Sequence, residues 1–305
     1  MNCTIDWPAA NQSRSTAMPL WHPEEARLYW TDCTTLFRFD PGTGANEAVF
    51  TSDIPIGAMT LQAGGSILLL RDGADVVSFK DGQATPMEVR HAADDDFSHA
   101  HFAGAAADSR GRVLCAVLSD AHHTGRIAML DTDGGLETLA DGFFIPGGIA
   151  FDDTSTRLYL TDSHVTRMRT HVFDYDADLG DLGDGRILHD AIAADDGFGG
   201  APAGIAVDED AFVWIARSGA SRIVRHSPDG EIADSVTVDV RRPLGVAFGG
   251  AGMDELYFTT LGGHMRVSDG LHAGDLGRIR GVPVKGATPF RSRIGEAKAD
   301  EGAEE

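Results

Sequence analysis

The chain has 305 residues, of which 42% are apolar and 24% charged, so it can bury a large core and is not a disordered chain. Its 47 Asp and Glu residues outnumber 25 Lys and Arg, and the net charge of −22 argues against nucleic acid or an anionic membrane surface as a partner. Residues 1–21 lack the pattern of a secretory signal, and no later stretch approaches the roughly 18 apolar residues of a membrane helix, so we expect a cytoplasmic protein.

Short strand patterns separated by Asp-Gly and Gly-Gly turns run through the chain, whereas helical periodicity is nearly absent. The patterns repeat as a triplet: an inner run rich in Gly and small residues, then two strands with aromatic or aliphatic centres. In chain order the inner runs are residues 19–21, 57–61, 102–107, 148–151, 204–207 and 245–248. The second strands are residues 28–32, 67–70, 113–117, 158–162, 212–215 and 256–259, and the third are 36–39, 76–79, 127–130, 171–175, 223–225 and 278–279.

Six copies of this triplet predict an all-β fold, a six-bladed β-propeller that forms a single domain over residues 1–296. Closing such a ring requires the two ends of the chain to share a blade, because an open edge leaves backbone groups unpaired. Residues 4–7 and 282–294 are the candidates for this closure. We expect residues 174–200 to form a long loop between blades, and the acidic residues 297–305 to form a disordered tail.

Several segments carry a joint signal in their order and spacing: Pro19-Leu20-Trp21, Leu158-Tyr159-Leu160-Thr161-Asp162-Ser163, Pro146-Gly147-Gly148-Ile149-Ala150-Phe151, Pro202-Ala203-Gly204-Ile205 and Pro243-Leu244-Gly245-Val246. Together they resemble the regucalcin and gluconolactonase-like six-bladed propellers, also called the senescence marker protein family. The resemblance runs nearly from end to end of the chain. It implies a lactone hydrolase that uses a divalent cation, held at one mouth of the channel by Glu, Asn and Asp side chains with a further Asn beside it.

The residues that would hold this cation are replaced in the present sequence. The positions of the family's three ligands carry Ala17, Gly147 and Ala203, the accessory Asn is Ala103, and the substrate-contacting Arg is His101. Alanine and glycine side chains offer no oxygen, whereas Ca²⁺ takes six or more oxygen ligands. We therefore expect no Ca²⁺ at the family site, and we assign no metal-ligating residue and no resident cofactor.

Histidines fall where this fold brings loops to the mouth of the channel. His99 and His101 enter the third inner strand, His123 follows the second strand of that blade, His164 follows Asp162-Ser163, and His264 follows the last second strand. We predict that His101, His123, His164 and His264 are catalytic, acting as general acid and base near neutral pH. A transition metal bound by these imidazoles is the alternative.

Four further residues are candidates for substrate contacts: His99, Arg217, Ser163 and Trp21. The predicted function is a lactonase-like hydrolase of a small cyclic ester or related metabolite, with a histidine-centred site in place of the metal, in a monomer or homodimer. Two alternatives remain open. One is a metal-free lyase, isomerase or condensing enzyme similar to strictosidine synthase-like propellers, and the other is a non-catalytic propeller that binds a small molecule or a protein. Convergence of the histidines on one cavity favours an enzyme.

Overall fold

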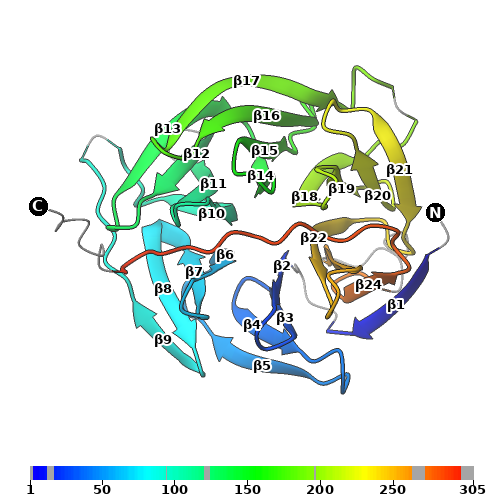
Figure 1. Cartoon of the computed structure of the whole chain (residues 1–305), viewed down its shortest axis with the longest axis horizontal. Helices are drawn as coiled ribbons and strands as arrows, with labels where there is room; N and C mark the ends of the chain where they lie inside the picture. The colour runs from blue at the N-terminus through cyan, green and yellow to red at the C-terminus, as the bar shows by residue number, and fades with distance from the viewer. Residues whose placement is uncertain are drawn as a thin grey trace, which may run out of the picture.

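The computed structural model describes residues 3–11, 17–93, 95–119, 124–195, 197–262 and 272–296. These residues form six four-stranded sheets that surround a central channel like the blades of a propeller, as Figure 1 shows. The predicted six-bladed β-propeller is therefore confirmed. Within the described ranges, no helix is long and apolar enough to cross a membrane.

Each blade runs from an inner strand beside the channel to an outer strand at the rim of the ring. The inner strands are β2 (Ala17–His22), β6 (Ile56–Leu61), β10 (Ala100–Ala107), β14 (Pro146–Phe151), β18 (Ala201–Val207) and β22 (Pro243–Gly249). The second strands are β3 (Arg27–Thr31), β7 (Ile67–Arg71), β11 (Val113–Ser119), β15 (Arg157–Asp162), β19 (Val213–Ser218) and β23 (Glu255–Thr260).

The third and outer strands complete the blades. The third strands are β4 (Thr35–Phe39), β8 (Asp75–Lys80), β12 (Thr124–Leu130), β16 (Arg169–Asp176), β20 (Arg222–His226) and β24 (Leu276–Arg280). The outer strands are β5 (Asn46–Thr51), β9 (Gln83–Pro86), β13 (Leu136–Phe143), β17 (Asp181–Asp190), β21 (Ile232–Thr237) and β1 (Thr4–Ala9), and one short 3-10 turn, η1 (Asp72–Ala74), joins β7 to β8.

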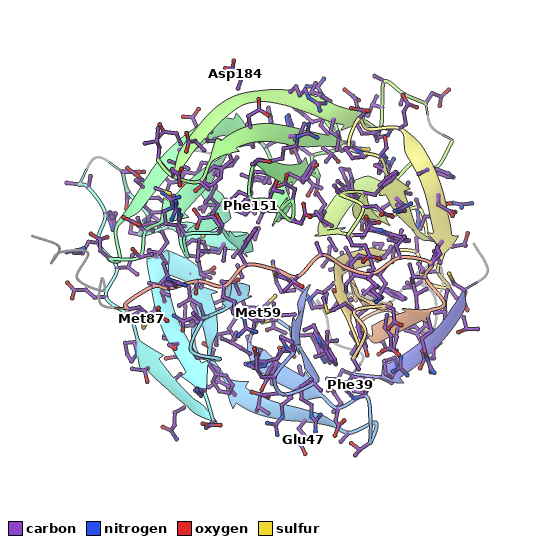
Figure 2. The ribbon with its side chains drawn as sticks, viewed as in Figure 1. Phe39, Glu47, Met59, Met87, Phe151 and Asp184 are labelled. Carbon is purple, nitrogen blue, oxygen red and sulfur yellow. The ribbon has the colours of Figure 1, made fainter. Side chains whose placement is uncertain are left out.

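The second strands form the centre of each blade and are covered on both faces by the neighbouring blades. In β15, Leu158, Tyr159 and Leu160 are all fully buried. A strand that is buried on both faces needs apolar residues at consecutive positions, which is why these segments are continuous apolar runs without alternation. Figure 2 shows Met59 and Phe151 beside the centre of the ring, whereas Glu47 and Asp184 lie at its outer edge.

The ring is closed by the amino-terminal strand. β1 is the outer strand of the blade formed by β22, β23 and β24, and it pairs with β24 through Thr4 and Arg280 and through Ile5 and Ile279. The Asp6 carboxylate also accepts hydrogen bonds from Arg278 and Arg280. The prediction for residues 4–7 is therefore confirmed, because β1 supplies the fourth strand of the last blade.

The carboxy-terminal segment, residues 282–296, does not join a blade, so the prediction that residues 282–294 help to close the ring is wrong. Figure 1 shows this segment as an orange-red trace that crosses the centre of the ring. It forms single bridges at Gly286, opposite Asp208, and at Ser292, opposite Gln62. The backbone of this segment therefore pairs with residues that follow the inner strands of two separate blades, and it does not extend the edge of one sheet.

The prediction of a single long loop over residues 174–200 is also wrong. This stretch contains the end of β16 and all of β17, and only residues 191–200 connect one blade to the next. The sequence of β17 is Asp-Leu-Gly-Asp-Gly-Arg-Ile-Leu-His-Asp, and most of its residues are exposed. An outer strand covered on one side needs few apolar residues, so its composition resembles that of a loop.

Glycines near the start of the inner strands bring the blades into backbone contact. A Cβ atom on Gly57 would lie 2.0 Å from the carbonyl oxygen of Phe102, and one on Gly104 would lie 2.2 Å from that of Gly147. The same contact recurs at Gly148 against Ala203, where the distance would be 2.4 Å. Only glycine allows this close approach of backbones, so these residues set the diameter of the channel mouth.

Candidate functional site

A cavity of about 520 Å³ occupies the central channel, and all six inner strands contribute to its wall. Its open mouth lies where the inner strands begin, and its other end lies where they finish. Pockets of roughly 300–1,000 Å³ are typical of small-molecule sites in proteins. The channel is therefore the candidate binding site.

The mouth is shaped by a repeated irregularity of the inner strands. Near the start of each, one extra residue interrupts the pairing with the second strand. Such bulges bend a strand and redirect its side chains. One residue of each blade at this level, which we call the mouth layer, lines the channel: Ala17, Gly57, Ala103, Gly147, Ala203 and Leu244.

The mouth layer does not fit the divalent-metal site that the family resemblance implies. It includes the four positions Ala17, Ala103, Gly147 and Ala203, and none of its six side chains carries an oxygen or nitrogen atom. Among the described residues, no group of three or more His, Cys, Asp or Glu side chains could hold a metal ion. Hard cations need several oxygen ligands at 2.0–2.6 Å, as a rule, and this layer supplies no side-chain oxygen.

His101 lies at the rim of the mouth and contacts a carboxylate from the neighbouring blade. Its Nδ1 atom is 2.7 Å from Oδ2 of Asp72, the first residue of η1. The ring of His101, like that of His164, is not part of the channel wall, whereas the next residue, Phe102, and the cross-strand partner of His101, Leu118, both line it. A carboxylate that accepts the Nδ1 proton fixes the tautomer and orientation of an imidazole, and Nε2 is then the basic ring nitrogen.

Ser163 and His164 lie on the loop that joins β15 to β16, beside the same mouth. Ser163 lines the channel, and its hydroxyl donates a hydrogen bond of 2.6 Å to the carbonyl oxygen of Pro202. The ring of His164 lies outside the channel wall: its Nδ1 is 2.7 Å from the hydroxyl of Thr166, and it packs 4.9 Å from the ring of Phe144. The structure therefore brings Ser163, but not the ring of His164, to the cavity.

The remaining candidates for substrate contacts occupy three different environments. Trp21 lines the channel and stacks on Tyr257, with ring centres 6.1 Å apart. His99 is exposed and lies outside the channel wall. Arg217 is 1% exposed, and its guanidinium donates to the carbonyl oxygens of Gly199 and Gly200. This contact holds the loop before β18 against β19.

His123 and His264, the other two predicted catalytic histidines, lie outside the described residues. His101 and His164 lie on the same face of the propeller, in the third and fourth blades, where the ring of His101 contacts Asp72 and that of His164 contacts Thr166. Of the predicted histidines, His101 alone among the described residues has a carboxylate partner, and it is therefore the strongest candidate for acid–base chemistry.

Asp72 was not predicted. It lies one position beyond the place that Asp162 holds in its blade, because Arg71 pairs with Ile56 as Asp162 pairs with Pro146. Asp32 accepts backbone hydrogen bonds from Thr34 and Thr35, and Asp162 accepts them from Phe144 and Ile145, so these two carboxylates order nearby turns. Asp72, one residue further along its own blade, instead contacts a histidine of the next blade.

The wall contributed by the carboxy-terminal segment was also not predicted. Residues 287–290 line the channel at the end opposite to the open mouth. The segment is held there by backbone bonds from Ala287 to the carbonyl of Val207 and from Ser292 to that of Leu61. Both acceptors are the last residues of inner strands, so the segment covers the end of the channel.

Comparisons with known sequences identify relatives that match nearly the whole chain. The chain is 33% identical over 292 residues to pentonolactonase XacC of Haloferax volcanii, covering 90% of this chain and 94% of that protein. It is 28% identical over 267 residues to 6-deoxy-6-sulfogluconolactonase of Pseudomonas putida, covering 85% and 88% of the two chains.

Solved structures share the fold. The calcium-binding protein regucalcin from Agrobacterium tumefaciens superposes with a TM-score of 0.81 at 18% identity, over 94% of this chain and 97% of that one. The family model described as the SMP-30/gluconolactonase/LRE-like region matches residues 17–262, which is most of the chain. The chain therefore belongs to the SMP-30/gluconolactonase/LRE-like family.

Proposed function

We propose that the protein hydrolyses a lactone or a related ester and that His101, oriented by Asp72, activates the attacking water at the channel mouth. The observation that carries this proposal is the contact of 2.7 Å between Nδ1 of His101 and Oδ2 of Asp72, beside a cavity whose mouth layer has no side-chain oxygen. The relatives named as lactonases support the reaction class. The proposed site differs from the family's in using an imidazole where the family uses a metal.

The proposed reaction needs two proton transfers. Nε2 of His101 accepts a proton from water as its oxygen attacks the acyl carbon, and the carbonyl oxygen becomes negatively charged. The C–O bond of the ring then breaks, and the imidazolium returns the proton to the leaving alkoxide, so that the product is a hydroxy acid. Asp72 stabilises the imidazolium between these two steps.

The developing negative charge requires hydrogen-bond donors at the mouth. The guanidinium of Arg217 already donates to loop carbonyls, so it is a poor candidate for this role. The proposed donors are backbone N–H groups at the bulges of the inner strands, other than those of Gly148 and Gly245, which donate to the hydroxyls of Thr161 and Thr259. The catalytic assignment therefore rests on His101, with Asp72 as a positioning residue.

The test measures hydrolysis of sugar lactones and aliphatic lactones by protein purified in the presence of a chelator. His101→Gln should lower kcat/KM by about 10²–10⁴, the usual contribution of general acid–base catalysis. The matched control is His91→Gln, at an exposed histidine on the preceding loop, and it should retain the activity. Unchanged hydrolysis by the His101 variant would reject the proposed base.

A positioning role for Asp72 predicts a second signature. Asp72→Asn keeps the shape of the side chain but removes its charge, so the imidazolium loses its stabilising carboxylate. The acid limb of the pH–rate profile should therefore move to lower pH, and kcat should fall more than KM changes. If Asp72→Asn lowers the Tm but leaves the pH–rate profile unchanged, Asp72 has only a structural role.

A second candidate function is a propeller that binds a small molecule without transforming it. It is favoured by the absence of oxygen or nitrogen atoms from the mouth-layer side chains, since loss of a catalytic metal site also produces this pattern. Binding of a ligand in the channel with no turnover, and with affinity that is equal in wild type and His101→Gln, would favour this function.

A further inference from the structure

We propose that the interior of the channel binds an elongated apolar group, so that the preferred substrate is a lactone or ester carrying an aliphatic or aromatic substituent rather than a polyhydroxylated sugar lactone. The substrate class rests on the proposed hydrolytic function, whereas the apolar character of the site follows from the channel itself.

The first argument is the composition of the wall below the mouth layer. Three positions after each mouth-layer residue, a second set of residues lines the channel: Leu20, Thr60, Ala106, Ala150, Ala206 and Ala247. The two layers together comprise twelve residues, of which only Thr60 carries a polar side-chain group. Deeper in the channel the wall includes Phe151, Val207 and Phe248. A ligand rich in hydroxyls would lose its hydrogen bonds to water here and find few replacements.

The acidic residue in the wall does not change this character. Asp152 lies at the far end of the channel, where its carboxylate accepts hydrogen bonds from the hydroxyls of Thr154 and Thr156 and from the backbone N–H of Thr156 and Arg157. These bonds come from the turn that follows β14. The carboxylate is therefore occupied by its own turn.

The second argument is that the channel is a pocket with one closed end. Residues 287–290 of the carboxy-terminal segment line its far end, with Pro289 and Phe290 adding apolar atoms. The bonds from Ala287 to Val207 and from Ser292 to Leu61 anchor the segment on opposite sides of this stretch. A group that enters at the mouth is thus enclosed along its length, which maximises the apolar area removed from water.

The third argument is an apolar rim at the mouth. Phe144 and Ile145, between β13 and β14, are 40% and 42% exposed, and Val165, on the neighbouring loop, is 67% exposed. Ile145 also lines the channel, so the exposed surface is continuous with the interior. Large exposed apolar side chains that border a pocket mark interaction sites. This rim offers the first contact to a lipophilic ligand.

These features point to binding energy that grows with the length of the ligand. Burial of each additional methylene group in an apolar site contributes about 0.8 kcal/mol, which is about a fourfold gain in affinity. The gain should stop when the chain fills the cavity. A polar site at the mouth alone would give no such dependence.

The test uses the neutral fluorophore N-phenyl-1-naphthylamine, whose emission increases in apolar surroundings, and linear alcohols from butanol to dodecanol as competitors. We expect saturable binding of one probe per chain and competition that strengthens by about threefold to fourfold per methylene until the channel is full. Absence of saturable probe binding, or competition independent of chain length, would overturn the inference.

Variants locate the probe. Ala247→Phe adds a large side chain to the channel wall and should weaken probe binding at least tenfold, and Ala247→Leu should weaken it less. The matched control is Ala48→Phe at an exposed position of β5, which should leave probe affinity unchanged. Thermal melting of each variant shows whether it is folded, and the leucine variant keeps the test valid if the phenylalanine does not fit. Equal probe affinity in folded wild type and both Ala247 variants would contradict a site in the channel.

Hydrolysis data separate this inference from the proposed function. If the probe and alcohols bind as expected but no lactone or ester is hydrolysed, the proposed function fails and the apolar site stands. If sugar lactones are hydrolysed through His101 and lactones with longer chains gain nothing in kcat/KM, the function stands and the inferred substrate class fails.

Discussion

Gly148 and Ala203 are in backbone contact across the boundary between the fourth and fifth blades, and a Cβ atom on Gly148 would lie 2.4 Å from the carbonyl oxygen of Ala203. The hydroxyl of Thr161 bridges the same two residues, accepting from the N–H of Gly148 at 2.9 Å and donating to the carbonyl of Ala203 at 2.7 Å. This contact fixes the separation between Ala203 of the mouth layer and Gly148, the residue after Gly147 of the same layer.

Gly148→Ala should therefore destabilise the protein by pushing the two blades apart. The expected cost is about 1–3 kcal/mol, the usual range for added atoms in a packed interior. Gly64→Ala is the matched control, because a Cβ atom there would have no neighbour within 4 Å. Chemical denaturation of both variants measures the difference, and equal stability of the two would contradict the close contact.

A second prediction is that the metal site implied by the family resemblance can be built on this scaffold. We expect a variant with Ala17→Glu, Ala103→Asn, Gly147→Asn and Ala203→Asp to bind a divalent cation, because it places oxygen ligands on four inner strands that share the same bulge. A side chain at position 147 has room, since its Cβ would lie 3.6 Å from Oγ1 of Thr161 and 3.7 Å from Oγ of Ser163.

Titration calorimetry with Ca²⁺ and Mn²⁺ measures this gain. The wild type is one control, and a variant that carries only Gly147→Asn is the other, because one amide oxygen is too few to hold a hard cation. Failure of the fourfold variant to bind either ion while folded would mean that the inner strands no longer have the geometry of a metal-binding mouth.

The fold was predictable because corresponding strands of all six blades lie in the same environment and therefore need the same kinds of residue. An inner strand near the channel needs small residues, and a second strand buried on both faces needs a continuous apolar run such as Leu158-Tyr159-Leu160. Outer strands need neither small residues nor a continuous apolar run, so the sequence of β17 was mistaken for that of a loop. The carboxy-terminal segment was misassigned because its two single bridges, at Gly286 and Ser292, leave no periodic pattern in the sequence.

The site was predictable only in part. Ser163, Trp21 and the mouth-layer residues line the channel, as expected from their fixed places in the repeat, and their contact with a substrate stays a prediction. It missed Asp72, since the contact between Asp72 and His101 joins residues of two blades and depends on the angle between them. It also could not tell that the Arg217 side chain folds back onto the Gly199 and Gly200 carbonyls, which no residue pattern encodes.

A third prediction separates the structural role of Arg217 from a role in substrate binding. Arg217→Met removes the hydrogen bonds from the buried guanidinium to the carbonyl oxygens of Gly199 and Gly200, which should cost about 1.5–3 kcal/mol of stability, the usual range for hydrogen bonds to a charged group. Probe affinity at the channel should stay the same at temperatures where the variant is folded. Arg186→Met, at an exposed position of β17, is the control. Loss of ligand affinity without loss of stability would assign Arg217 to the binding site.

A fourth prediction concerns the pH dependence of stability and rests on His171 in β16. Burial lowers the pKa of His171 below 6.5, with Arg169 adding to the shift and Asp162 opposing it. Among the described residues its Nε2 has no hydrogen-bond partner, and its ring packs edge-on against Phe143. The folded protein therefore holds this imidazole neutral while the unfolded chain takes up a proton, so stability is lost as the pH falls below 6.5.

His171→Phe removes this proton uptake and should reduce the fall in Tm between pH 8 and pH 5.5. The effect cannot exceed about 1.4 kcal/mol at pH 5.5, one unit below the unfolded value, because each unit is worth that amount. Other groups titrate in the same range, so the quantity to compare is the difference between variant and wild type at each pH. His99→Phe, at an exposed histidine, should show the full wild-type fall in Tm. An equal fall in wild type and His171→Phe would mean that His171 titrates in the folded protein as it does in the unfolded chain.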